Sequence, residues 1–263
     1  MSGRWGGWMP VLLHSDLLHA LDASLFAREA LNVTLDPWQR DALRSTAQRQ
    51  VWLCSRQAGK SVTAAALAAH TALYQAGSLT LLISPSLRQS AELFRKVGDV
   101  LDNLDQRPAL TEDNKLSLTM TNRSRVVSLP SSESTVRGFS GVNLIIEDEA
   151  SRVDDSLHAA IRPMLAVSGG RMILMSTPAG KRGHFYDVWQ DGGDRWQRTI
   201  VTASDVPRIS ADFLADERAA LGERWYRQEY ACSFEETEGA LFDYATIAGA
   251  ITNDIAPLFG GDR

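Results

Sequence analysis

The sequence predicts an α/β fold in which a mostly parallel central sheet is flanked by helices on both faces. Short apolar runs bounded by turn residues alternate with helix-length segments through the first two thirds of the chain, and strands joined by helical crossovers pair in parallel. The chain has 263 residues, of which 44% are hydrophobic. That is enough to form one large domain, or one domain with a small appendage.

The first half of the chain supplies the first strand and helix units. An amphipathic helix is expected over residues 15–31, because apolar residues recur there at helical spacing behind a serine that can cap the first turn. Apolar runs of five or six residues then predict strands, and alanine-rich or 3.6-periodic segments predict helices. The expected order is a strand at 50–54, a helix at 61–76 ended by Gly77, a strand at 79–84 closed by Pro85, and a helix at 87–101.

The second half continues the alternation and then becomes less regular. Residues 116–121 and 125–129 alternate apolar and polar side chains as strands do, and a polar, glycine-containing loop at 131–141 follows. The remaining core elements are expected as a strand at 142–147, a helix at 155–165 and strands at 171–176 and 196–202. Helices near 211–221 and 224–231 predict a small C-terminal lid.

Residues 54–61, Cys-Ser-Arg-Gln-Ala-Gly-Lys-Ser, lie between an expected buried strand and an expected helix. In a phosphate-binding loop of this kind, backbone N–H groups at the helix N-terminus surround the phosphates, a lysine reaches the β and γ oxygens, and a hydroxyl binds Mg²⁺. Lys60 and Ser61 suit these roles. Cys54 stands where the usual pattern has glycine, but strand, loop and helix occur in the required order, so the loop predicts binding of a nucleoside triphosphate.

Three acidic residues end the expected strand at 142–147. Strand ends of an open α/β sheet carry its ligands, so Asp148 is predicted to hold Mg²⁺ and Glu149 to orient and deprotonate the attacking water. Two alternatives stay open: a pairing of Glu147 with Asp148 in the same roles, and three acids that only solvate the end of a strand. Together with Lys60 and Ser61, the preferred assignment of Asp148 and Glu149 predicts an ATPase with a P-loop NTPase fold of the ASCE type.

Four further features are candidates for parts of the same site. The amide of Gln39 can match the donor and acceptor edge of adenine; equally, Trp38 suits packing in a core and Gln39 a position that faces water. Arg137 precedes a glycine in a polar loop and suits either the γ-phosphate or a surface salt bridge. Arg56 suits either the γ-phosphate or a nearby acid. The segment Ser176-Thr177-Pro178 suits either a link from the phosphates to moving parts or a plain turn.

Composition excludes several other classes of function. No run of about 18 apolar residues and no signal peptide occurs, so a cytosolic protein without a membrane span is expected. With a net charge of −5, the chain lacks the excess of basic residues that is typical of a tight nucleic-acid binder. Two cysteines, expected to be buried, and five scattered histidines without metal-ligand spacing imply no metal beyond nucleotide-bound Mg²⁺.

The whole constellation resembles the ATPase domain of a tailed-phage terminase large subunit, the motor that drives double-stranded DNA into a preformed capsid. The matching residues are Trp38-Gln39, residues 55–61, Val136-Arg137-Gly138, Asp148-Glu149-Ala150, Ser176-Thr177-Pro178 and the stretch 221–230 with Phe234. A loop that begins Ser-Arg-Gln is typical of that family.

The resemblance implies ATP and Mg²⁺ as cofactors and a role for each matching position. It implies catalytic roles for Glu149, Lys60, Arg137 and Arg56, metal binding by Ser61 and Asp148, and coupling by Ser176, Thr177 and Pro178. It implies nucleotide binding by Trp38, Gln39, Ser55, Gln57, Ala58, Gly59, Lys60 and Ser61. Arg137 would act as an arginine finger, on the ATP of a neighbouring subunit in a ring.

The resemblance also implies partners and a division of the chain. Double-stranded DNA, the portal protein and the small terminase subunit are the expected partners, in the cytoplasm of an infected bacterium. The division is an N-terminal helical segment at 1–31, the ATPase core at 32–202, the lid at 203–240 and a linker at 241–263 toward an absent nuclease domain, so no nuclease activity is expected. The competing hypotheses are a helicase-like ATPase and a non-hydrolysing, nucleotide-dependent assembly module.

Overall fold

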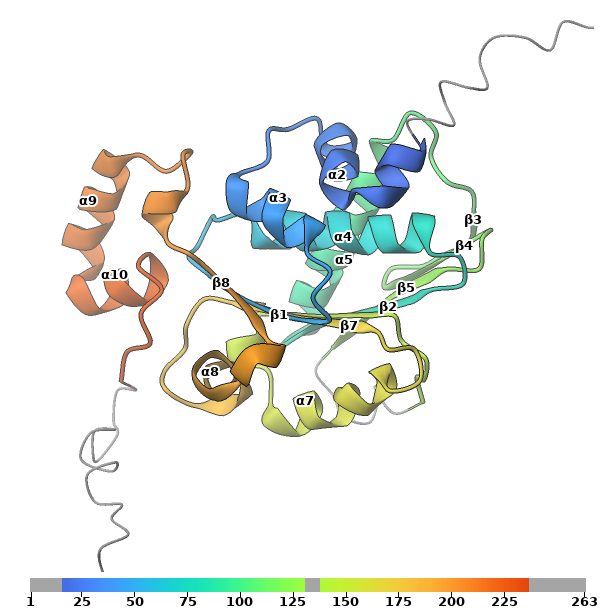
Figure 1. Ribbon diagram of the computed structural model, residues 1–263. Coiled ribbons are helices and arrows are strands. Elements are labelled where there is room, and N and C mark those ends of the chain that lie inside the picture. Colours follow the sequence, from blue (N-terminus) through green and yellow to red (C-terminus); the bar gives the residue numbers. More distant parts are fainter. Residues whose placement is uncertain (1–15, 131–137, 237–263) are drawn as a thin grey trace, which may run out of the picture.

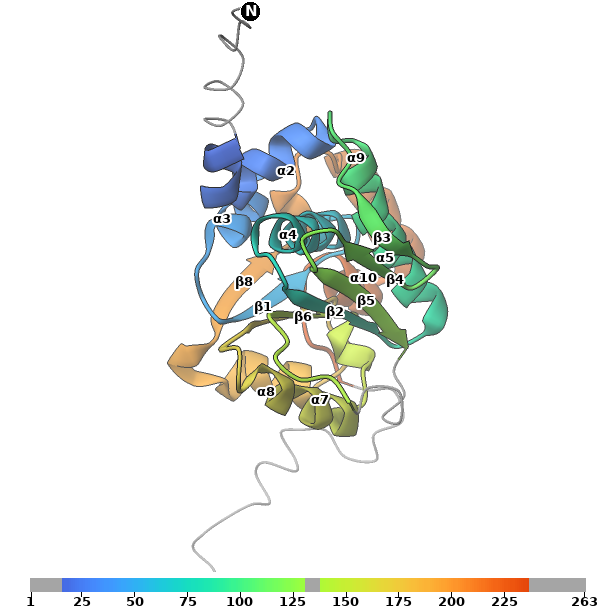
Figure 2. The same cartoon turned by 90° about the vertical axis from the view of Figure 1, so that its right-hand side faces the viewer.

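A computed structural model describes residues 16–130 and 138–236 and confirms the α/β prediction. Its centre is an eight-stranded sheet in the order β3-β4-β5-β2-β6-β7-β1-β8. The six strands from β5 to β8 in that order pair in parallel, and β4 and β3 add an antiparallel edge. Helices cover both faces of the sheet, which Figures 1 and 2 show from two sides.

The strands that build the site are the most completely buried. The strand bounds are β1 Arg49–Cys54, β2 Leu79–Ser84, β3 Leu110–Asp113, β4 Ser117–Met120, β5 Arg125–Pro130, β6 Leu144–Asp148, β7 Arg171–Ser176 and β8 Gln197–Val201. All five residues of β6 are buried, and β6, β7 and β1 are neighbours in the sheet. Because these strands are parallel, their carboxyl ends meet at one edge of the sheet.

Figure 1 shows helices α2, α3, α4 and α5 over one face of the sheet and helices α7 and α8 over the other. The first group is α2 Ala23–Leu31, α3 Pro37–Arg44, α4 Lys60–Tyr74 and α5 Leu87–Asp102, and the second is α7 Asp155–Ile161 and α8 Gly183–Asp191. Helix α4 packs closely because six of its buried residues are alanines. The buried apolar residues accordingly form two clusters, one on each face of the sheet.

Some elements differ from the expectation, each for a local reason. The helix expected at 15–31 breaks at Asp22, whose carboxylate accepts hydrogen bonds from the first N–H groups of α2. The helix expected at 155–165 tightens into a 3₁₀ turn at Arg162–Leu165, because Pro163 lacks the N–H of an α-helix. Helix α8 and the short, exposed strand β3 were not expected.

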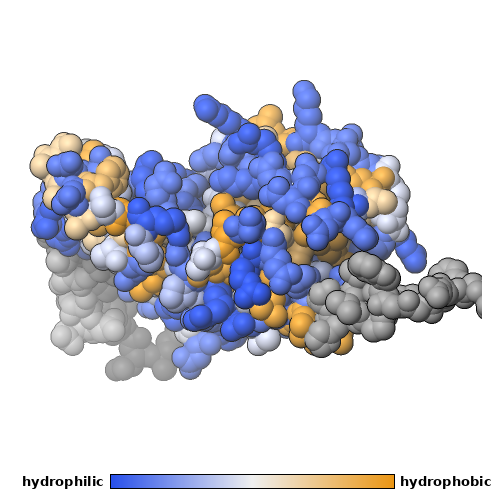
Figure 3. Space-filling model, turned by 90° about the horizontal axis from the view of Figure 1, so that it is seen from above, coloured by the Kyte–Doolittle hydropathy of each residue, from blue (hydrophilic) through white to orange (hydrophobic). Residues whose placement is uncertain are grey.

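The segment predicted as a lid contains α9 Ala211–Leu221 and α10 Glu223–Glu229, which meet at Gly222. Helix α9 buries none of its residues. Figure 3 looks down on the molecule, and on the lid hydrophobic residues gather at the surface; Phe213 and Trp225 are among the exposed ones. Both cysteines are buried as expected, although Cys232 follows α10 instead of lying in a helix. Within the part of the chain described, no helix has the length and apolarity needed to cross a membrane.

Candidate active site

The loop between β1 and α4 has the backbone conformation of a phosphate cradle. Gln57 and Gly59 both have positive φ angles, 60° and 90°. At Gly59 a β-carbon would also lie 2.8 Å from Nε2 of Gln39, so only glycine fits there. Helix α4 begins at Lys60, directly after this turn. Its first N–H groups therefore face the loop and form an anion-binding helix terminus.

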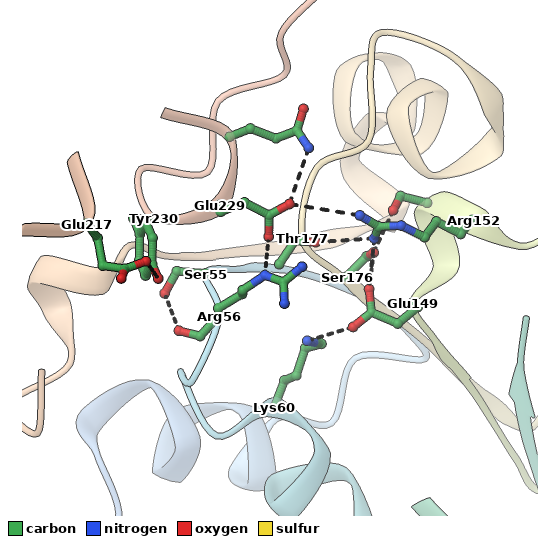
Figure 4. A network of polar contacts seen from close by, with 12 residues as sticks. Ser55, Arg56, Lys60, Glu149, Arg152, Ser176, Thr177, Glu217, Glu229 and Tyr230 are labelled. Carbon is green, nitrogen blue, oxygen red and sulfur yellow. Dashed lines mark hydrogen bonds and ion pairs between the residues drawn. The ribbon is translucent and has the colours of Figure 1, made fainter. Parts of the chain in front are cut away.

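Lys60 and Glu149 face each other across the site and form an ion pair, with Nζ 2.9 Å from Oε1 (Figure 4). Burial alone would lower the pKa of Lys60, but the nearby charges of Glu149 and Asp148 outweigh it and raise that pKa. Lys60 therefore stays protonated, and its ammonium group can bind a phosphate oxygen in place of the Glu149 carboxylate.

Asp148 and Glu149 leave the end of β6 together, on the side of the phosphate loop. Asp148 is buried, and burial raises its pKa to about 6 against the opposing charge of Lys60. Glu149 has a left-handed backbone conformation, with φ of 53°, and its N–H donates to Oδ1 of Asp148 at 3.0 Å. The turn thus directs the Glu149 carboxylate toward Lys60.

Glu147 points to the opposite face of the sheet, as the alternation of a strand requires. It is fully buried and contacts His158 and His184, whose rings are stacked with centroids 4.1 Å apart. Burial alone would raise the pKa of Glu147, but hydrogen bonds from the two histidines lower it. Of the two acid pairs considered, only Asp148 and Glu149 therefore lie beside Lys60.

The histidine cluster also corrects the sequence analysis. Spacing along the chain gave the five histidines no partners, whereas the fold brings His158 of α7 and His184 of α8 together at Glu147. Burial alone would lower the pKa of His184, but Glu147 and Asp155 raise it. The sequence did not indicate that these two histidines meet, because they are 26 positions apart and helix α8, which carries His184, was not expected.

Arg152 is a member of the site that the sequence analysis missed. Its Nη1 donates to Oε2 of Glu149 at 3.0 Å and to the hydroxyl of Thr177 at 3.3 Å. Its Nη2 lies 4.0 Å from Oε1 of Glu229, at the end of lid helix α10. Figure 4 shows Arg152 between the acid at the end of β6 and the lid. The spacing of three residues from Glu149 was the one available signal.

Arg56 points toward the lid. Its Nε donates to Oε2 of Glu229 at 2.5 Å, and its backbone N–H donates to the Glu229 carbonyl at 3.1 Å. This ion pair raises the pKa of Arg56. Of the two roles considered for Arg56, the structure places it with the nearby acid, while its side chain still lines the pocket.

Gln39 fastens α3 to the phosphate loop. Its Oε1 accepts the N–H of Asp36 at 2.9 Å, and its Nε2 donates to the hydroxyl of Thr63 in α4 at 2.9 Å. The Thr63 hydroxyl in turn donates to the carbonyl of Gly59 at 3.0 Å. Trp38 lies apart from the pocket, packed edge-to-face on Trp52. Adenine recognition by this pair stays a prediction.

These residues surround a cavity of about 630 Å³. Its walls are formed by Val33, Thr34, Gln39, Arg56, Gln57, Ala58, Gly59, Lys60, Ser61, Val62, Gln89, Lys96, Glu149, Arg152, Thr177 and Arg208. Five of these side chains are basic and one is acidic, a balance that suits a triphosphate. Ser61 and Asp148 offer the hydroxyl and carboxylate oxygens that Mg²⁺ prefers, so the residues present fit that ion.

Of the remaining predicted residues, Ser55 lies in the phosphate loop, and Ser176 and Pro178 lie at and beyond the end of β7. Ser55 is buried at the start of the loop, where its N–H donates to the carbonyl of Val201. Ser176 shares a hydrogen bond of 2.7 Å with Ser151 and also reaches Oε2 of Glu149 at 3.4 Å. Pro178 is buried beyond Thr177. Arg137 lies outside the described residues.

Comparison with known proteins decides the family. Residues 51–248 match the family described as terminase large subunit, T4likevirus-type, N-terminal. The chain belongs to this terminase family. The matched segment starts on β1 and includes the phosphate loop, the acids after β6 and the lid helices.

Among curated terminase large subunits, that of Thermus phage G20c is 26% identical over 235 residues, which span 76% of this chain and 48% of the relative. The large subunit of Escherichia phage T5 is also 26% identical, over 77% of this chain and 48% of the relative. The chain thus spans about half the length of these terminases. The solved ATPase domain of the Thermus phage P74-26 large terminase superposes with a TM-score of 0.70 at 24% identity, covering 79% of this chain and 97% of that domain. The terminase fold is therefore shared.

Proposed function

We propose that this chain is the ATP-hydrolysing motor domain of a terminase large subunit, which translocates double-stranded DNA into a procapsid. The observation that carries the proposal is the Lys60–Glu149 pair at the rim of a basic pocket, in a chain of the terminase family. A lysine that can bind phosphate and a carboxylate that can activate water lie within 2.9 Å of each other. ATP entering the pocket separates them and leaves each free for its own task.

The hydrolytic roles follow from the positions of these groups. The N–H groups at the start of α4 and the ammonium of Lys60 bind the β- and γ-phosphates. Glu149 orients a water for in-line attack on the γ-phosphorus and accepts its proton, while the bond to the β-bridging oxygen breaks to give ADP and phosphate. Ser61 and Asp148 would hold Mg²⁺, which would neutralise charge developing on the phosphates.

Coupling to the lid runs through the two arginines that meet Glu229. Arg152 holds Glu149 before ATP binds, and the same guanidinium reaches Thr177 in the coupling segment. A γ-phosphate competes with Glu149 and Glu229 for Arg152 and Arg56, because it carries more negative charge than either carboxylate. Nucleotide binding thereby loosens or shifts α10, and Ser176, Thr177 and Pro178 transmit the change to the sheet edge.

The Glu149→Gln substitution tests this proposal. The amide keeps the shape of the side chain but cannot accept the proton, so ATP binding should persist while steady-state phosphate release falls about 10²- to 10⁴-fold. Glu92→Gln, on the exposed surface of α5, is the matched control and should hydrolyse ATP at the wild-type rate. Unchanged phosphate release by Glu149→Gln would eliminate Glu149 as the base.

Assembly into a ring on the portal, with the small terminase subunit and DNA as partners, is part of the same proposal. In it Arg137 serves the ATP of a neighbouring subunit. Arg137→Ala should then bind ATP but hydrolyse it poorly, and mixing it with Glu149→Gln should restore some turnover at shared interfaces. Absence of any rescue at ring-forming concentrations speaks for a role of Arg137 within its own subunit.

A further inference from the structure

The buried cluster of Glu147, His158 and His184 lies on the far side of β6 from the nucleotide pocket. One ligand atom from each residue lies within 4.8 Å of the others. All three residues are more than nine-tenths buried, and they come from three different elements, β6, α7 and α8. We propose that this cluster is a binding site for a divalent transition metal of the zinc class, separate from the Mg²⁺ site of the nucleotide.

The spacing of the ligand atoms fits such an ion. Nδ1 of His158 lies 3.2 Å from each oxygen of Glu147, and Nε2 of His184 lies 3.1 Å from Oε2. Zinc bonds of about 2.0–2.1 Å in a tetrahedron place neighbouring ligand atoms about 3.3 Å apart. Two imidazoles and one carboxylate form a common zinc donor set that leaves a fourth position for water.

Asp155 supplies the outer support that metal-binding histidines typically have. Its Oδ1 accepts the backbone N–H of His184 at 2.7 Å and lies 2.9 Å from Nδ1 of the same residue. A carboxylate can only accept, so the proton of a neutral His184 sits on Nδ1, and the lone pair of Nε2 faces Glu147. With a neutral ring two electron-rich atoms face each other there, so either a second proton on the ring or a metal ion must lie between them.

Charge balance allows a divalent ion in place of protons on the two rings. Glu147 and Asp155 contribute two negative charges, and two neutral histidines contribute none. A 2+ ion neutralises the cluster, which removes the penalty of a buried, uncompensated carboxylate. The rings are nearly parallel, at 11°, so binding requires them to tilt until both lone pairs point at the ion.

An ion there would join the end of β6 to α7 and α8, one residue before Asp148. It would thereby fix the strand end that presents Asp148 and Glu149 to the pocket. The metal is a structural cross-link in this proposal and takes no part in hydrolysis, so it stands or falls independently of the ATPase function.

Metal content of the untagged full chain provides the test. The protein is equilibrated with micromolar Zn²⁺ in excess Mg²⁺, and bound zinc is measured after gel filtration. We expect one zinc per chain and a rise in Tm of about 5–10 °C at a hundredfold excess over Kd. His184→Asn should abolish retention, and Asp155→Asn should weaken affinity about 10- to 100-fold.

Two control variants make the result specific. His70→Asn removes a half-buried histidine whose Nε2 forms a hydrogen bond with the His19 carbonyl, and this variant should keep the zinc. Asp148→Asn should also keep it, because Asp148 belongs to the nucleotide side of β6. Equal zinc retention by His184→Asn and wild type would overturn the proposal.

Cobalt gives a readout that does not depend on the folding of a variant. The wild-type protein with Co²⁺ should show the intense visible bands of a four-coordinate nitrogen and oxygen site, and Zn²⁺ should abolish them. Absence of such bands at tenfold excess of Co²⁺ also overturns the proposal, leaving the cluster as a metal-free ion pair.

Discussion

Helices α4 and α9 both contain several alanines, yet they occupy opposite environments. Helix α4 buries eight of its residues against the sheet, whereas α9 buries none. The core is held by close packing of small and branched side chains, which fixes its shape. The lid meets the phosphate loop through charged groups, above all through Glu229 and its arginines. We propose that shape positions the reacting groups and that charge lets the predicted lid respond to a nucleotide.

Lys60→Ala should produce the largest effect, because it removes the cation on which the core site centres. Without Lys60 the phosphates lose their main counter-charge, and kcat/KM for ATP should fall by about 10³-fold or more. Titration with a fluorescent ATP analogue measures the loss of binding directly. Lys115→Ala, at an exposed position, is the matched control. Wild-type affinity of Lys60→Ala would contradict the assignment.

The next largest effect is expected in the pH dependence of the free energy of unfolding, which tests the burial of Asp148 in the core. Burial raises the pKa of Asp148 from 3.8 to about 6. The folded state then favours the protonated acid, so the stability contributed below pH 4 is lost as the pH rises through about 6. Two pKa units correspond to about 3 kcal/mol as an upper bound.

The Asp148→Asn variant lacks this titration and isolates the effect. In urea unfolding without nucleotide, its free energy of unfolding relative to wild type should rise by up to about 3 kcal/mol between pH 4 and pH 7.5. Asp212→Asn, on the exposed lid helix α9, should change by less than about 0.5 kcal/mol. A flat difference between the two pH values for Asp148→Asn would show that this carboxylate is not desolvated.

The sequence predicted the residues of the core site better than the contacts between the core and the predicted lid. Lys60, Asp148 and Glu149 were predictable because each belongs to a contiguous pattern: a loop before a helix, or acids after an apolar strand. Glu229 was not, because it meets Arg56 from 173 positions away. The contacts of Glu147 were missed because they join β6 to two helices far along the chain, α7 and α8, and helix α8 was not expected. Charged contacts between distant segments leave no periodicity, so the lid link was the least predictable part.

A pair of identical substitutions tests the contrast in packing. Ala66→Leu adds three carbon atoms to a fully buried position in α4 and should destabilise the protein by about 1–3 kcal/mol. Ala215→Leu makes the same change on the exposed surface of α9 and should stay within about 0.5 kcal/mol of wild type. Chemical denaturation measures both. Equal destabilisation would mean that α9 is packed against another surface in solution.

The smallest effect on ATP turnover is expected for the ion pairs that connect α10 with the core. Glu229→Gln keeps the size of the side chain but removes the charge that pairs with Arg56 and Arg152. Each hydrogen bond to a charged partner is worth about 1.5–3 kcal/mol, and the amide oxygen retains part of it. ATP turnover should therefore fall only about tenfold, and the Tm should fall by a few degrees.

The sites at which a protease cuts the Glu229→Gln variant show whether the loss of charge loosens the lid or the core. Limited proteolysis should cut Glu229→Gln near α9 and α10 faster than wild type, because the lid has lost its charged attachment while the sheet is untouched. Glu223→Gln, which removes an exposed partner of Arg218 within the lid, should leave both turnover and cleavage unchanged. If Glu229→Gln matched this control in both measurements, the lid would be held to the core by packing, and phosphate charge could not release it.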